Sequence, residues 1–274
     1  MNEQEFGLGA LFSPIDIRDY LLTSVKHTNH NLPDKFQLEV LKIKNQGSKK
    51  TCVAFSLSEI IEYHNKRDIG KYQRFSTDFI YGCRNDTDYK EEGMYLRDAL
   101  KVIQKYGDVV YELLPGNSSV TNAINKVNKN FDKLKQQAYI NRISAYYKIK
   151  TVDELKYSLF TLGPAVCSMK WYNKAYLNSD KIYTYDKNND YSGHAVVILG
   201  WDENNWILQN SWGHVWGDKG LFKVPINNSF GELFHEVYGV TDEIEKIKKP
   251  NKIKKLTAPI SNKLLNIVKN YVNK

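Results

Sequence analysis

The chain has 274 residues, of which 42% are hydrophobic and 13% aromatic, and this composition excludes an intrinsically disordered protein. Its net charge is +8, but only six of the 39 basic residues are arginine, the residue that nucleic-acid readers use for bidentate contacts. Lysine excess alone is a weak sign of nucleic-acid binding, so we expect no nucleic-acid partner.

The cysteines and the N-terminal residues indicate the cellular compartment of the protein. Cys52, Cys83 and Cys167 are too few, and odd in number, for a disulfide framework, which indicates a reducing compartment. Residues 1–5 are acidic and polar, without a secretory signal pattern, and no run of about eighteen apolar residues occurs. We therefore expect no membrane span and a cytoplasmic location, or a virion or host cell if the source is viral.

Three segments are predicted along the chain. Residues 1–31 form an irregular arm, because Gly7, Gly9 and Pro14 interrupt any regular pattern. Residues 32–240 form the main domain. Residues 241–274 form a basic tail in which lysines precede an amphipathic pattern at 260–272. This tail is either a membrane-surface or partner-binding segment or a solubilising linker with a docked helix, and we favour the linker.

The first half of the main domain is predicted to be mainly helical. A helix starts at or near Cys52, runs to about residue 67 and stops at Gly70. The other expected elements are a short strand within 36–43, a helix ending at 81 and capped by Ser76 or Thr77, a helix over 94–106, and either a surface helix or an insertion over 117–137.

The second half is predicted to be rich in β-strands. The expected strands span 138–149, 165–171, 194–201, 205–210 and 220–224, with a helix over 152–162. A helical half followed by a β half indicates an α+β fold whose two lobes meet at a cleft.

Cys52 is the first candidate for chemistry. The free amides and positive dipole end at a helix N-terminus favour a negative charge, so a thiol there tends to become the nucleophilic thiolate. The other interpretation is a buried structural cysteine.

Two further motifs supply what a nucleophilic thiol needs. His194 opens an apolar strand, and Asn210 lies in a segment rich in Trp and Gly. Each alone fits a packed core residue, but together with Cys52 they provide a base and a group that orients it. Gln46, six residues before the cysteine, can donate to an oxyanion. No Cys-x-x-Cys pair occurs and the arm histidines stand in a polar context, so no metal or cofactor is expected.

These residues carry a family resemblance. The stretches Asn-Gln-Gly-Ser from Asn45, Cys-Val-Ala-Phe-Ser from Cys52, Gly-His-Ala around His194 and Asn-Ser-Trp-Gly from Asn210 resemble the papain/cathepsin family of cysteine peptidases. His194 and Asn210 follow Cys52 by 142 and 158 residues, close to the spacing of about 130–150 in that family. The resemblance covers about residues 32–240.

The resemblance implies a papain-like two-lobed fold, with the nucleophile helix in the helical lobe, an antiparallel β lobe and the active site between them. It implies hydrolysis of polypeptide substrates through a thioester acyl-enzyme. The implied roles are Cys52 as nucleophile, His194 as base and then acid, Asn210 as its orienter, Gln46 as oxyanion donor, Trp212 as a shield for the His–Asn bond, and Gly93 as a substrate-binding position.

Departures from the family pattern leave alternatives open. Lys49 replaces a disulfide cysteine, which would leave Cys83 without its partner, and Lys50 replaces a glycine near the cleft wall. One alternative is a papain-fold binding or structural protein with impaired catalysis. Another is a transpeptidase or ligase that uses the same residues.

The arm is much shorter than the inhibitory propeptide of the family. Two interpretations remain open for residues 1–31. The arm lies across the cleft and keeps the enzyme latent by self-inhibition, or it packs on the outer surface of the domain.

Overall fold

The structure is a computed structural model that describes residues 6–14, 16, 19, 21, 32–84 and 92–242. The chain divides into two units, 1–243 and 244–274, and every described residue belongs to the first. The lysine cluster and the amphipathic helix predicted for the tail lie outside the described residues.

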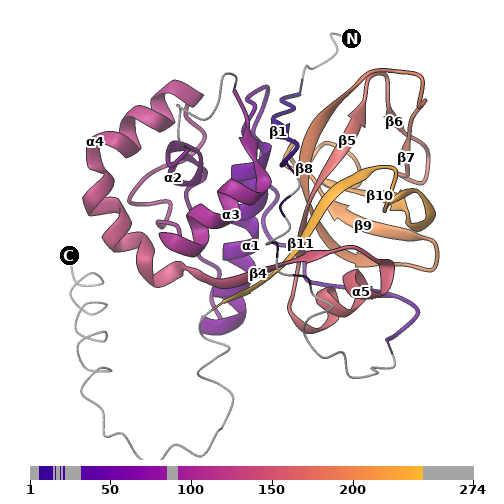
Figure 1. Ribbon diagram of the computed structural model, residues 1–274, viewed down its shortest axis with the longest axis horizontal. Coiled ribbons are helices and arrows are strands. Elements are labelled where there is room, and N and C mark those ends of the chain that lie inside the picture. Colours follow the sequence, from indigo (N-terminus) through magenta and orange to yellow (C-terminus); the bar gives the residue numbers. More distant parts are fainter. Residues whose placement is uncertain are drawn as a thin grey trace, which may run out of the picture. The chain divides into compact units, whose positions relative to one another are not determined.

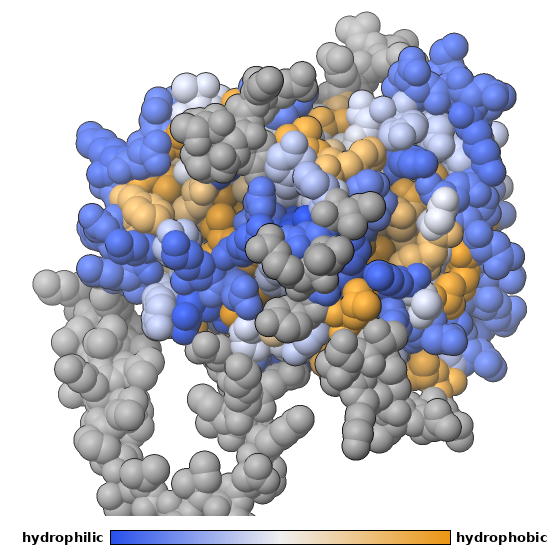
Figure 2. Space-filling view, in the orientation of Figure 1, coloured by the Kyte–Doolittle hydropathy of each residue, from blue (hydrophilic) through white to orange (hydrophobic). Residues whose placement is uncertain are grey.

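The described part has the predicted α+β architecture. Figure 1 shows helices α1 to α4 gathered on one side and the large sheet with α5 on the other. The helices are α1 (Cys52–Ile69), α2 (Thr77–Gly82), α3 (Leu96–Lys105), α4 (Val120–Ala138) and α5 (Val152–Thr161). In the same orientation, hydrophilic residues cover much of the visible face and hydrophobic residues appear in patches between them (Figure 2).

One antiparallel sheet forms the β lobe. Its strands follow the order β10-β9-β8-β5-β11-β4, and β2 pairs with β8 outside that path. The strands are β2 (Phe36–Gln37), β4 (Ile143–Ile149), β5 (Ala165–Tyr172), β8 (Tyr191–Trp201), β9 (Asn205–Gln209), β10 (Leu221–Pro225) and β11 (Phe234–Asp242). Two short ladders complete the described strands: β1 (Ala10–Leu11) runs parallel to β3 (Met94–Tyr95), and β6 (Tyr176–Leu177) runs antiparallel to β7 (Tyr183–Thr184).

From His194 onward both faces of β8 are buried, which explains the run of apolar residues there. Successive side chains of a strand point to opposite faces. Ala195 and Val197 pack with α1, whereas Val196 and Ile198 pack into the interior of the β lobe. The strand therefore joins the two hydrophobic cores, and it fixes the β lobe against the helix that begins with Cys52.

Helix α1 is the central element of the helical lobe. Its first eleven residues are all buried, and its end is capped by Gly70 in the left-handed conformation, with φ of 72°. The predicted stop is thus confirmed, because glycine adopts this conformation without a Cβ penalty. The predicted cap of α2 is also present: the Ser76 side chain accepts from the Phe79 amide at 3.2 Å.

Several predicted boundaries were wrong. Residues 117–137 form mostly helix, and α4 continues to Ala138, so the strand predicted from residue 138 begins at Ile143 after a 3-10 turn, Tyr139–Asn141. The strand predicted from 194 begins at Tyr191, which places His194 inside it. The strand expected within 36–43 has only two residues, and β1, β3, β6, β7 and β11 were not predicted. Two-residue strands depend on a distant partner, which a local pattern does not reveal.

Candidate active site

Cys52 is the first residue of α1 and is fully buried. Burial raises the pKa of its thiol, and backbone amides of Ala195, Gly9 and Val53 act in the opposite direction. The sequence led us to expect a lowered pKa at this helix N-terminus. In this structure burial has the larger effect, and Gly9, one of the amide donors, belongs to the N-terminal arm.

His194 and Asn210 are joined by a buried hydrogen bond. His194 Nε2 lies 2.8 Å from Asn210 Oδ1, and the Ser211 amide donates to the same oxygen at 2.8 Å. An amide oxygen only accepts, so Nε2 carries the proton and Nδ1 is the basic nitrogen. Nδ1 has no hydrogen-bond partner among the described residues. Burial lowers the pKa of His194 to about 4, and the bond to Asn210 acts in the opposite direction, so the imidazole is neutral at pH 7.

Trp212 covers the imidazole. Its ring stacks on His194 with centroids 4.6 Å apart and planes 29° from parallel, and only 4% of Trp212 is exposed. Trp212 thus covers one face of the imidazole, and His194 and Asn210 are both buried.

Gln46 lies in the loop just before α1, and its amide points to the arm. Its side-chain nitrogen donates to the Gly7 carbonyl at 3.0 Å and to the Lys49 carbonyl at 2.6 Å, and its oxygen accepts from the Ser211 hydroxyl at 2.5 Å. Hydrogen bonds therefore hold the Gln46 amide at both its nitrogen and its oxygen. The nitrogen already donates to a peptide carbonyl of the arm, that of Gly7.

Gly93 lies beside the arm as well. Its φ is +113°, and a Cβ there would lie 2.6 Å from the Gly9 carbonyl oxygen, so only glycine fits. The next residue makes a backbone hydrogen bond to the arm: the Met94 amide donates to the Gly9 carbonyl at 2.9 Å. Met94 was not among the predicted site residues, because a backbone donor leaves no signal in residue type.

Residues 6–14, the longest described stretch of the arm, run between the two lobes (Figure 1). In Figure 1 their strand β1 lies between the helices and β8. The Gly7 amide donates to the Gly47 carbonyl at 3.1 Å, and a Cβ on Gly193 would lie 1.8 Å from the Ala10 oxygen. The arm backbone thus packs closely against the loop before Cys52 and against Gly193, the residue before His194.

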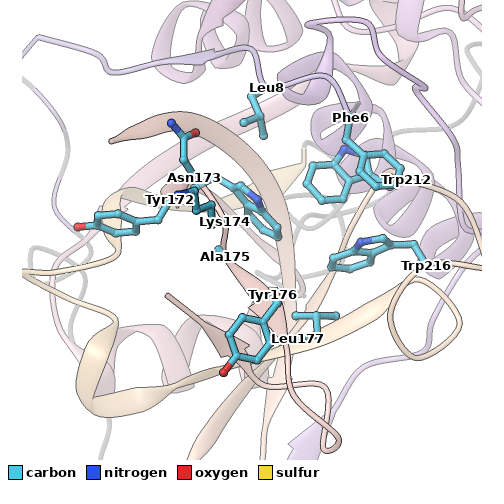
Figure 3. A pocket seen from close by; sticks show the side chains of 11 residues that line it. Phe6, Leu8, Tyr172, Asn173, Lys174, Ala175, Tyr176, Leu177, Trp212 and Trp216 are labelled. Atoms are coloured by element: carbon cyan, nitrogen blue, oxygen red, sulfur yellow. The ribbon is translucent and has the colours of Figure 1, made fainter. Parts of the chain in front are cut away.

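An aromatic cavity of about 280 Å³ adjoins the site (Figure 3). Phe6 lies at this cavity and stacks on Trp212, with centroids 4.4 Å apart and planes 11° from parallel. Trp171, Trp216 and Leu177 form other parts of the lining. An aromatic side chain of the arm therefore occupies the apolar surface next to the imidazole.

No disulfide bond holds the loop before Cys52. Cys52, Cys83 and Cys167 are all free. Asn117 takes part in holding the loop from the helical lobe: it accepts from the Lys49 ammonium at 2.7 Å and donates to the Asn45 carbonyl at 3.1 Å. Hydrogen bonds thus link this loop to the helical lobe, where the family resemblance would place a disulfide.

Two searches of the described residues, for a metal site and for a membrane-spanning helix, gave no candidate. No cluster of three or more His, Cys, Asp or Glu side chains there could hold a metal ion. Among the described helices, none has the length and apolar character needed to cross a bilayer.

Residues 31–242 match the profile of the papain family of cysteine proteases. The chain belongs to this family. Cathepsin B-like cysteine proteinase 3 of Caenorhabditis elegans is 26% identical over 227 residues, which cover 70% of this chain and 61% of that protein. Mouse cathepsin K is 29% identical over 207 residues, which cover 69% of this chain and 57% of that protein. The chain therefore matches only about three fifths of the length of these relatives.

Solved structures show the same fold. Xylellain, a cysteine protease from Xylella fastidiosa, superposes with a TM-score of 0.72 at 23% identity, covering 88% of this chain and 98% of that one. Procathepsin B S9 from Trypanosoma congolense gives a TM-score of 0.65 at 19% identity, with 86% of each chain covered. The papain-like architecture predicted from the motifs is thereby confirmed.

Proposed function

We propose that this papain-family protein is a cysteine peptidase that hydrolyses peptide bonds, with Cys52, His194, Asn210 and Gln46 as its catalytic residues. The observation that supports this most is the neutral His194, fixed by Asn210 so that its basic Nδ1 has no other described partner. A neutral imidazole with a free basic nitrogen can take the proton of a thiol, which is the role that nucleophilic catalysis requires of a base.

The proposed reaction has two stages. Cys52 Sγ attacks the substrate carbonyl while its proton passes to His194 Nδ1. The tetrahedral oxyanion accepts from the Gln46 side chain and the Cys52 amide, and the leaving amine takes the proton from His194. Water then attacks the thioester, gives its proton to His194, and releases the acid product together with the Cys52 thiol.

We also propose that the arm keeps the enzyme latent. Its backbone occupies the Gln46 donor and covers Cys52, and burial raises the pKa of that thiol. A covered thiol that stays protonated does not attack a substrate. With three free cysteines, a reducing location such as the cytoplasm is the proposed setting.

Two alternatives remain. Loss of turnover with retention of the fold would make the protein a binding module, and the replacement at Lys50 motivates that idea. Transfer of the acyl group to an amine would make it a transpeptidase or ligase. Acyl transfer and hydrolysis use the same residues, so the products of the reaction decide between them, whereas a binding module would give no product.

The test uses the full-length chain and a variant in which Gly9→Val displaces the arm. Both are incubated with a peptide library in H₂¹⁸O, with an added amine, and the products are analysed by mass spectrometry. Hydrolysis places ¹⁸O in each new carboxyl terminus. Ligation joins the acyl fragment to the amine instead, and that product would contradict the hydrolase proposal.

An epoxysuccinyl inhibitor provides the matched control. We expect one adduct on Cys52 of the Gly9→Val chain. Adding His194→Ala should lower the rate of adduct formation roughly a thousandfold. A folded Gly9→Val chain that neither labels nor cleaves any peptide would support the binding-module alternative and refute the peptidase.

A further inference from the structure

A second polar cluster lies away from Cys52, where residue Asp19 contacts three elements of the domain. The Arg97 guanidinium of α3 makes two bonds to the Asp19 carboxylate, at 2.8 and 2.7 Å. The Lys148 ammonium of β4 lies 3.3 Å from the same carboxylate, and the Tyr238 hydroxyl of β11 lies 3.4 Å from it. Two cations and a hydroxyl from three separate elements thus converge on one carboxylate.

This cluster is buried, unlike a surface ion pair. The side chains of Arg97 and Asp19 are only 7% and 6% exposed. A fork-shaped guanidinium that meets a carboxylate with two parallel bonds gives both strength and a defined geometry. Removing one partner would leave the other charge buried and unpaired, which is far more costly than breaking an exposed pair.

The cluster is continuous with the part of the arm that covers the site. The Arg97 side chain donates to the Pro14 carbonyl at 2.5 Å, and its backbone amide donates to the Ser13 hydroxyl at 3.4 Å. Ser13 in turn donates to the buried carboxylate of Glu236 at 2.9 Å. Arg97 therefore fixes the arm both at Asp19 and at the end of the segment that passes over Cys52.

We propose that Arg97, Lys148 and Tyr238 form a binding site for a peptide carboxylate, here called the carboxylate socket. Asp19 of the chain's own arm fills it and thereby holds residues 6–14 over Cys52. The socket acts ten residues away from Gly9 and outside the catalytic residues. It deepens the proposed latency and rests on it, but the binding site can be tested without any turnover.

The first test measures the rate at which iodoacetamide alkylates Cys52 in the full-length chain, followed by intact mass and peptide mapping. Alkylation needs an accessible thiol and no hydrolysis. Asp19→Asn keeps the side-chain shape but removes the charge, and we expect the rate to rise at least tenfold. Asp19→Glu keeps the carboxylate and should stay nearer to the wild-type rate.

Controls separate the socket from a general loss of charge. Asp132→Asn removes a charge from the exposed side of α4, where Asp132 pairs with Lys135 at 2.6 Å, and should leave the rate unchanged. Arg97→Gln should raise the rate like Asp19→Asn, and the double variant should not exceed the larger single effect, because both remove one interaction. An Asp19→Asn chain that labels within twofold of wild type, while Gly9→Val labels fast, would overturn the socket.

The second test adds the ligand in trans. A synthetic peptide of residues 6–21 is titrated against the full-length Asp19→Asn chain, and protection of Cys52 from alkylation is measured. The peptide with Asp19 should protect at least tenfold better than the same peptide with Asn at this position, and the difference should vanish when the chain also carries Arg97→Gln. Equal protection by both peptides would refute carboxylate recognition. Fast alkylation without peptide cleavage would contradict only the peptidase proposal and leave the socket in place.

Discussion

The middle and the ends of the arm are held in different ways. In the middle, Gly7 and Gly9 have no side chains, and their backbone fits closely against the loop before Cys52. At one end, Phe6 stacks on Trp212, and at the other, Asp19 forms a buried ion pair with Arg97. The middle therefore depends on shape, and the ends depend on apolar and ionic contacts.

The middle of the arm and its two ends therefore contribute differently to the position of the arm. A glycine backbone can pack closely against the loop before Cys52, but it buries little apolar area, and its attachment there rests on backbone hydrogen bonds such as Gly7–Gly47 and Met94–Gly9. We expect the side-chain contacts at the two ends to add to this attachment. Substitutions in the middle should therefore exclude the arm outright, whereas substitutions at Phe6 should only weaken it.

The largest effect is expected for Gly9→Val. A Cβ on Gly9 would lie 2.3 Å from the Lys50 carbonyl oxygen, a backbone atom with little freedom to move. Overpacking of this kind costs about 1–3 kcal/mol, so alkylation of Cys52 should accelerate on the order of 100-fold. The measurement is the second-order rate constant of iodoacetamide labelling at constant pH.

Leu8→Val is the matched control for Gly9→Val. It places the same side chain one residue earlier, where a Cβ is already present. Its labelling rate should stay within a few-fold of wild type. If the two variants labelled equally fast, the steric fit at Gly9 would not be what seats the arm.

The sequence names candidate catalytic residues but does not give the path of the arm. Cys52, His194, Asn210 and Gln46 belong to motifs in which the proposed chemistry demands a residue type, so motif and spacing single them out, and their catalytic roles stay predictions. The structure brings His194 and Asn210 within 2.8 Å. The cap at Ser76 and the stop at Gly70 were predictable for a related reason, since each rule is local.

The path of the arm could not be predicted, because its contacts are not encoded by local pattern. Gly7 and Gly9 appeared only as interruptions, yet their lack of side chains is what permits close approach. Asp19 and Arg97 are 78 residues apart, and nothing near either position identifies the other. The Met94 amide is a backbone group that every residue type except proline supplies.

The next effect concerns pH and links the arm to His194. Burial lowers the pKa of His64 to about 3 and that of His194 to about 4, from 6.5. Both stay neutral in the folded chain while the unfolded chain takes up protons below pH 6.5, so stability falls as the pH falls. Each should lower the free energy of unfolding by about 2 kcal/mol between pH 7 and 5.

Comparing wild type with Gly9→Val shows how much of the pH dependence of stability comes from the burial of His194 by the arm. Displacing the arm should expose His194 and return its pKa toward 6.5, whereas His64 stays buried. The variant should therefore lose about 1–2 kcal/mol less stability than wild type between pH 7 and 5, measured by urea unfolding. Glu59, whose pKa burial raises to about 7, acts in the opposite direction in both chains and cancels in the difference. Identical pH slopes would show that the arm does not bury His194.

The smallest effect is expected for Phe6→Ala, which removes the apolar contact and leaves the middle and the Asp19 end intact. A stacked aromatic pair contributes about 0.5–1.5 kcal/mol beyond its buried area, so Cys52 labelling should rise about tenfold or less. Phe6→Leu keeps apolar area without the stack and should fall between Phe6→Ala and wild type. Combining Phe6→Ala with Asp19→Asn should multiply the two rate increases, because the two ends lie far apart along the arm and share no contact among the described residues. A double variant no faster than Asp19→Asn alone would mean that Phe6 stays on Trp212 only while the ionic end holds it there, and the two ends would then form one cooperative anchor.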